Sequence, residues 1–278
     1  MGVVLFHSAF GFTILAVAMN GLQAIYLNAV ANRHKLFHKP TYVTAFVYIS
    51  LCSLYVEFGR FSQPLLINWI LIAVLDNMLQ LSQAQKPRKL IYNSGFLIGI
   101  AALLSFPAIV YILLLLVALA LLRNLNPGEW MVAILGCLTP VYFAAGLLFL
   151  FDVLHWFPEW VNLGVNLPGT ISKPVFLVGA IMGMIILFTA GTYVLQKQLG
   201  RASVFVRRGW TGIAMCLIFS IIAAAITDSS IKMAWLVIMP SITLIIANAY
   251  YAEKNKAFSN FAFYFMLLLV VFCKLAGG

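Results

Sequence analysis

Acidic residues are scarce in this sequence, which holds 7 Asp and Glu side chains against 17 Lys and Arg in 278 residues. Charged residues of both signs make up only 9% of the chain, while hydrophobic residues make up 64%. A soluble domain of this length cannot hide so much apolar surface, so the composition excludes a water-soluble fold. Lipid must surround the outer face, and the backbone must satisfy its own hydrogen bonds.

The sequence also lacks the polar–apolar alternation of transmembrane barrel strands. Segments such as 109–122 are apolar throughout, which leaves α-helices as the spanning elements. We therefore predict an all-α polytopic bundle in which residues 1–278 form a single integral membrane domain. The four cysteines lie far apart in apolar runs, so we expect small buried side chains and no disulfide framework.

The apolar runs predict about ten helices, at residues 3–30, 41–58, 64–84, 91–105, 107–122, 130–151, 173–195, 209–227, 233–251 and 261–275. Most of these runs reach the roughly 20 residues that span a bilayer. The fourth and fifth runs are shorter and are separated only by Ser105, Phe106 and Pro107. They form either one long kinked helix or a hairpin of two short helices.

The distribution of basic residues decides between these alternatives. With two helices, one side of the membrane holds thirteen basic residues, namely Arg33, Lys35, Lys39, Lys86, Arg88, Lys89, Arg123, Lys197, Arg201, Arg207, Arg208, Lys254 and Lys256. The other side then holds four, Arg60, Lys173, Lys232 and Lys274. With one helix, the later loops change sides and the counts become nine and eight. The positive-inside rule favours the hairpin, with its turn at Phe106 and Pro107.

This topology predicts a bacterial inner-membrane protein with both termini outside the cytoplasm. The net charge of +10 would suggest nucleic acid in a soluble protein. Here it indicates topology and contact between the basic inner loops and anionic lipid headgroups, and we expect no nucleic-acid partner. The N-terminus lacks a signal peptide, so we expect a mature first helix, and one explanation for its outside start is that the natural chain begins upstream of Met1.

Three stretches carry a family resemblance: residues 89–107 (KLIYNSGFLIGIAALLSFP), Gly128-Glu-Trp130, and residues 135–142 (LGCLTPVY). In these the chain resembles a family of uncharacterised multi-pass inner-membrane proteins from Bacteroidota, some of which carry an automatic label of β-carotene monooxygenase. More distantly, the paired short helices after a basic loop are similar to polytopic glycosyltransferases and polymerases that use polyprenyl-linked sugars. The first resemblance implies a membrane fold and no established activity.

A polar stripe marks the third predicted helix, because Asn68, Asp76 and Gln80 recur there at multiples of four. A charge near mid-membrane costs about 2.5–3.5 kcal/mol on insertion scales, so Asp76 must face protein or water. The first predicted helix places Asn20 and Gln23 at a similar depth. These residues form either a midplane site for substrate or protons, or an interhelical hydrogen-bond cluster that fixes packing.

An outer-face segment is the best candidate for chemistry. Asp152, His155 and Glu159 have the i, i+3, i+7 spacing of one helical face, where they could bind a divalent cation or perform acid–base catalysis. Glu57 and Arg60 lie in another outer loop and could join them, with Arg60 holding a phosphate. The alternative is that the aromatic residues of this segment form an interfacial belt.

An iron oxygenase needs several histidine ligands at one site, and the chain has only His7, His34, His38 and His155. His34 and His38 lie in a predicted inner loop, while His7 and His155 belong near the opposite face. They cannot meet across the bilayer, so the sequence does not support the carotenoid-oxygenase label.

Three functions remain open. The first is an envelope-biogenesis enzyme, glycosyltransferase-like or polymerase-like, that acts on a lipid-linked substrate at the outer face with or without a divalent metal. The second is a transporter or flippase with a midplane polar site around Asp76. The third is a non-catalytic subunit of an envelope or secretion complex.

Overall fold

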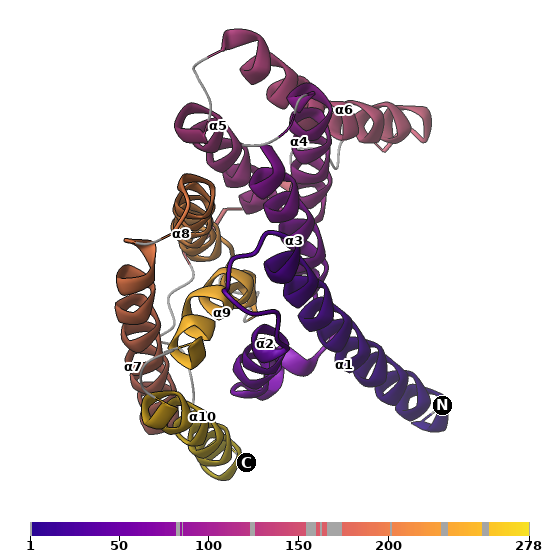
Figure 1. Cartoon of the computed structure of the whole chain (residues 1–278). Helices are drawn as coiled ribbons and strands as arrows, with labels where there is room; N and C mark the ends of the chain where they lie inside the picture. Colours follow the sequence, from indigo (N-terminus) through magenta and orange to yellow (C-terminus); the bar gives the residue numbers. More distant parts are fainter. Residues whose placement is uncertain are drawn as a thin grey trace. The chain divides into compact units, whose positions relative to one another are not determined.

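The computed structural model describes residues 2–81, 84, 86–122, 126–153, 160–161, 163–165, 174–200, 202–228, 233–251 and 256–277. Every regular element in these ranges is a helix, which confirms the predicted all-α fold (Figure 1). The α-helices are α1 (Gly2–Arg33), α2 (Val43–Ser53), α3 (Gln63–Leu81), α4 (Pro87–Leu104), α5 (Val110–Leu122), α6 (Pro127–Leu150), α7 (Pro174–Leu199), α8 (Val204–Ala225), α9 (Met239–Ala247) and α10 (Lys256–Gly277). Short 3₁₀ segments are η1 (Val56–Gly59), η2 (Phe106–Ile109), η5 (Ala234–Ile238) and η6 (Asn248–Tyr251).

Seven helical segments of the described ranges are long and apolar enough to cross a membrane. They are 11–33, 63–81, 127–150, 178–199, 204–225, 234–251 and 257–275, and two shorter apolar helices cover 43–53 and 106–121. The chain is therefore a multi-pass membrane protein.

Contacts divide the chain into two compact units. Unit 1 contains residues 1–65, 167–207 and 239–278, and unit 2 contains residues 66–166 and 208–238. In unit 1, α2 packs between α1 and α9, and α7 packs against α9, η6 and α10. The contact of α7 with α9 is close, because a Cβ placed on Gly191 would lie 2.3 Å from the Ile245 carbonyl oxygen.

In unit 2, the break between α4 and α5 confirms the predicted hairpin. Ser105 is extended (φ −153°, ψ 118°) and ends α4, because Pro107 has no N–H to donate to the carbonyl of residue 103. After η2, α5 packs back against α4, and both helices contact α6. The 13 residues of α5 rise about 20 Å, less than a ~30 Å hydrocarbon core. The position of the turn in the outer leaflet stays a prediction.

The tightest packing of unit 2 joins α4 to α6. Cβ atoms placed on Gly95 and Gly99 would lie 2.4 Å from the carbonyl oxygens of Ala133 and Cys137 respectively. A Cβ on Gly136 would lie 2.6 Å from the Tyr92 carbonyl oxygen. The Gly95–Ala133 and Gly99–Cys137 pairs advance together along both helices, which indicates that α4 and α6 run parallel. Only glycine lets the two backbones approach this closely, as in other GxxxG helix pairs.

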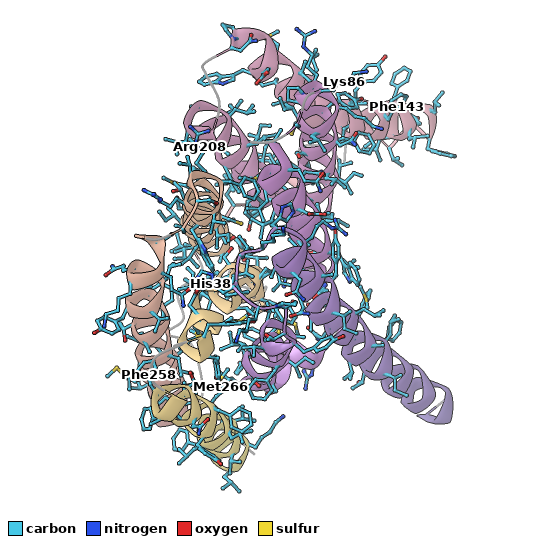
Figure 2. The ribbon with its side chains drawn as sticks, in the orientation of Figure 1. His38, Lys86, Phe143, Arg208, Phe258 and Met266 are labelled. Carbon is cyan, nitrogen blue, oxygen red and sulfur yellow. The ribbon has the colours of Figure 1, made fainter. Side chains whose placement is uncertain are left out.

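After Pro140, which lies inside α6, the helix presents large apolar side chains to its surroundings. Phe143, labelled in Figure 2, projects from this segment of α6, and Tyr142, Leu147 and Leu150 are exposed with it. α10 exposes a comparable row of aromatic and aliphatic residues. Exposed apolar faces of this size are expected where lipid replaces water as the solvent.

The ninth predicted helix, at residues 233–251, differs from expectation. Residues 233–251 were expected to form one helix, but the chain forms η5, α9 and η6 in succession. Pro240 cannot donate a backbone hydrogen bond to residue 236, which loosens the first junction. At the second junction, the Asn248 side-chain Nδ2 donates to the carbonyl oxygens of Leu244 and Ile245 (3.0 and 3.2 Å).

Candidate functional site

Asp76 is a buried carboxyl group in the apolar helix α3, with only 6% of its surface exposed. The Gln80 side-chain amide, one turn further along, donates to Asp76 Oδ1 at 3.2 Å. This contact confirms that the i, i+4 spacing places the two groups on one face. A carboxyl group in this position can accept and release a proton, and burial makes its charged form the more costly one.

Asn20 and Gln23 tie α1 to its neighbours in unit 1. The Gln23 amide donates to the Leu65 carbonyl oxygen (2.7 Å), and the Tyr48 hydroxyl donates to Gln23 Oε1 (2.7 Å). The Asn20 amide donates to the carbonyl oxygens of Ala16 (3.1 Å) and Phe58 (3.2 Å). Both polar ends of Gln23 are thus engaged in helix–helix contacts, which is the packing role considered from the sequence.

The four residues expected to form one midplane site belong to different units. Asn20 and Gln23 lie in unit 1, and Asp76 and Gln80 lie in unit 2. The hydrogen bonds described above for each pair remain inside its own unit. A single site built from all four therefore stays a prediction, while the Asp76–Gln80 pair is a structural fact.

Glu57 and Arg60, both expected on the outer face, form an ion pair on and beside η1. Arg60 Nη1 lies 2.9 Å from Glu57 Oε2, and the Arg60 side chain is 62% exposed. Tyr55, just before η1, has a pKa raised above its ordinary value, first by burial and then by the Glu57 charge, with Arg60 opposing both. An exposed guanidinium with one carboxylate partner retains donors that could bind a phosphate.

Asp152 does not lie on the helical face expected for it. α6 ends at Leu150, and Asp152 is exposed in a left-handed backbone conformation with φ 57°. Asp152 therefore lies beyond the end of α6. His155 and Glu159 themselves lie outside the described residues. In the described part of the chain no three His, Cys, Asp or Glu side chains gather as metal ligands, so a divalent metal stays untested.

Two of the histidines are described with their side chains. His34 is buried beside the end of α1, and His38 is exposed in the loop that follows. The side chain of His7 and the whole of His155 lie outside the described residues.

Glu129 is a buried acidic residue that the sequence analysis did not single out as a site. It lies in the first turn of α6, where Pro127 begins the helix and Asn126 Oδ1 accepts the Gly128 N–H at 3.0 Å. The Asn-Pro-Gly-Glu order was the available signal, because an acid in the first turn is favoured by the helix dipole. Its position indicates helix capping.

The free cysteines Cys52, Cys137, Cys216 and Cys273 are all buried, as expected from their apolar surroundings. Comparison of the chain with protein-family models, with curated proteins and with solved structures finds no match.

Proposed function

We propose that this chain is a transporter or flippase of the bacterial inner membrane that moves a polar or lipid-linked substrate and exchanges a proton at Asp76. One observation carries the proposal: a carboxyl group, 6% exposed, stands within an apolar spanning helix and accepts a hydrogen bond from Gln80. Such groups are costly in a membrane, and proton relays and substrate pathways are where they are retained.

The chemistry of the Asp76–Gln80 pair favours titration over packing alone. An asparagine at position 76 would offer Gln80 the same acceptor oxygen without the cost of an ionisable group in lipid. A carboxyl group adds the ability to change charge, which packing does not require. A change of charge on Asp76 alters the hydrogen bonds that it can make with Gln80. Protonation can therefore shift the equilibrium between two conformations of the protein.

A second candidate is an enzyme of envelope biogenesis that acts on a lipid-linked substrate at the outer face. It is favoured by the exposed Arg60, held by Glu57 at 2.9 Å, as a phosphate contact. In this proposal Asp152, His155 and Glu159 supply acid–base groups or bind a divalent metal.

The orientation belongs to the proposal as well. We place both termini outside the cytoplasm and the basic loops on anionic headgroups, following the thirteen-to-four distribution of basic residues in the sequence. Lipid headgroups are then the first partners of the protein, and a lipid-linked sugar is a substrate class that both candidates share.

The test is mass-spectrometric profiling of envelope lipids and glycans in a deletion strain complemented with matched variants at equal expression. Asp76→Asn keeps the shape and removes the proton, while Asp152→Asn makes the same change at an exposed site. Arg60→Gln probes the phosphate contact. We expect deletion to accumulate a precursor, Asp76→Asn to accumulate it too, and Asp76→Glu to restore at least part of the activity.

Different outcomes separate the candidates. If Asp152→Asn and Arg60→Gln accumulate the precursor while Asp76→Asn clears it, the enzyme proposal replaces transport. If all three variants clear it as the wild type does, neither site is functional, and a non-catalytic subunit becomes the better account.

A further inference from the structure

Among the described residues of unit 1, several buried side-chain oxygens have no hydrogen-bond partner, and three of them are Asn28 Oδ1, Thr44 Oγ1 and Asn248 Oδ1. The residues come from α1, α2 and η6, and their exposed fractions are 4%, 0% and 0%. Most buried polar atoms in folded proteins are paired, and each unpaired one costs about 1–3 kcal/mol. We consider these three because each lies a few residues from one junction of three helices.

Thr41 connects the three helices at one end of unit 1. The Asn32 side-chain amide of α1 donates to the Thr41 carbonyl oxygen at 3.5 Å. The Thr41 hydroxyl shares a hydrogen bond with the Tyr251 hydroxyl of η6. The Tyr251 ring also stacks on Phe37 with centroids 4.4 Å apart. The end of α1, the start of α2 and the end of η6 thus meet around Thr41.

Each of these three oxygens belongs to a residue three or four positions from a member of this junction. Asn28 precedes Asn32 by four residues on α1, so the two side chains share a face. Asn248 precedes Tyr251 by three residues in a 3₁₀ turn, where side chains at i and i+3 eclipse each other. Thr44 follows Thr41 by three residues.

The directions of the helices bring these three positions toward the same end of unit 1. Gln23 bonds Tyr48 at 2.7 Å, so α1 and α2 run antiparallel from the junction. Phe46 meets Tyr250 with ring centroids 6.3 Å apart, which places η6 beside the start of α2. The Asn248 amide nitrogen is already engaged with the Leu244 and Ile245 carbonyls, so its oxygen must turn away from them.

The chemistry of these groups selects the ligand. Two amide oxygens and one hydroxyl are hard, neutral donors of electron pairs, while divalent cations in proteins usually recruit carboxylates. The carboxyl ends of α1 and of the α9–η6 segment both point at this junction and favour a positive charge. Arg33, Lys35 and Lys39 in the adjoining loop are exposed, where water and salt screen them.

We propose that Asn28, Thr44 and Asn248 form a binding site for an alkali-metal cation. Neutral oxygens at the ends of interrupted helices suit such ions in membrane proteins. The site lies in unit 1 and involves neither Asp76 nor Gln80, so its failure in a binding assay leaves the proposed function untouched.

The test measures the thermal unfolding midpoint of the purified full chain in detergent at pH 8, where histidine side chains are neutral. Sodium chloride and potassium chloride are titrated against choline chloride at constant ionic strength. We expect at least one of the two alkali ions to raise Tm in a saturable way that choline does not reproduce, because a ligand that binds only the folded state stabilises it.

Thr44→Val replaces the hydroxyl by a methyl group of the same shape. The concentration of the effective ion at half-maximal Tm shift is expected to rise about tenfold or more, and Thr44→Ser should restore the wild-type value. Thr243→Val is the matched control, because the Thr243 hydroxyl is equally buried and unpaired. It lies five residues before Asn248, on another face of α9, and should leave the ion response unchanged.

The proposal fails if neither alkali ion shifts Tm more than choline does. It also fails if Thr44→Val and Thr243→Val respond to the effective ion alike. If Thr44→Val only raises Tm by the same amount in every salt, the hydroxyl was an unpaired polar group without a ligand, and no cation site exists there.

Discussion

The parallel contact of α4 with α6 gives a prediction whose size follows from the structure. A Cβ placed on Gly99 would lie 2.4 Å from the Cys137 carbonyl oxygen and 2.4 Å from Pro140 Cγ. Ordinary contact begins at 3.4 Å, so Gly99→Ala must separate the helices locally by about 1 Å. Overpacking of this kind costs about 1–3 kcal/mol of unfolding free energy.

The double variant sharpens this prediction. Gly95 faces the Ala133 carbonyl oxygen at 2.4 Å on the same side of α4. Once one alanine has moved the helices apart, the second alanine meets a gap that is already open. Gly95→Ala plus Gly99→Ala should therefore cost clearly less than the sum of the single variants, as expected for residues that share one backbone shift.

The assay is equilibrium unfolding of the purified protein in mixed micelles. The control is Gly146→Ala in the partner helix α6, because no atom lies within 4 Å of its Cβ position. If Gly99→Ala unfolds at the same denaturant concentration as Gly146→Ala, the close backbone approach is not a source of stability. Strict additivity of the two single variants would refute the shared shift.

Three further predictions follow from other contacts. Tyr48→Phe should cost about 1 kcal/mol of unfolding free energy. Gln23→Leu should cost more in the same mixed-micelle assay, because it removes both the hydrogen bond from the Tyr48 hydroxyl and the one to the Leu65 carbonyl. Trp160→Phe should cost about 1 kcal/mol in that assay, since it removes the 2.9 Å bond from the indole N–H to the Ala102 carbonyl but keeps a ring against Phe106. In a cysteine-free background, an impermeant maleimide on intact spheroplasts should label Arg60→Cys and not Lys39→Cys; the reverse pattern would invert the proposed topology.

The helices of this chain could be predicted from the sequence because the bilayer fixes their length and composition. Runs of apolar residues predicted ten helices, and their ends differ from those of the ten observed α-helices by up to six residues. The break before Pro107 could be predicted because proline has no backbone N–H, and because two helices put most basic residues on one side of the membrane. The 3₁₀ segments around α9 did not follow, because the 234–251 stretch is apolar throughout most of its length and the Asn248 side chain bonds its own helix.

The candidate sites were predicted less completely, for a physical reason. The Asp76–Gln80 contact is local, so its spacing alone predicted it. The partners of Asn20 and Gln23 include the backbone carbonyls of Phe58 and Leu65, and a carbonyl group leaves no trace in residue identity. The left-handed backbone of Asp152 depends on where α6 ends, which residue spacing does not specify.

The parallel pairing of α4 and α6 constrains how the protein is made. Gly95 and Gly99 face a partner that the ribosome supplies only after α5 and the first part of α6, roughly forty residues later at ~5–20 residues per second. During those seconds the glycine face of α4 lacks the α6 backbone that covers it in the folded chain. A nascent chain arrested before residue 127 therefore lacks the helix that packs on this glycine face. A chain in which α4 and α6 are paired has been extended beyond residue 127.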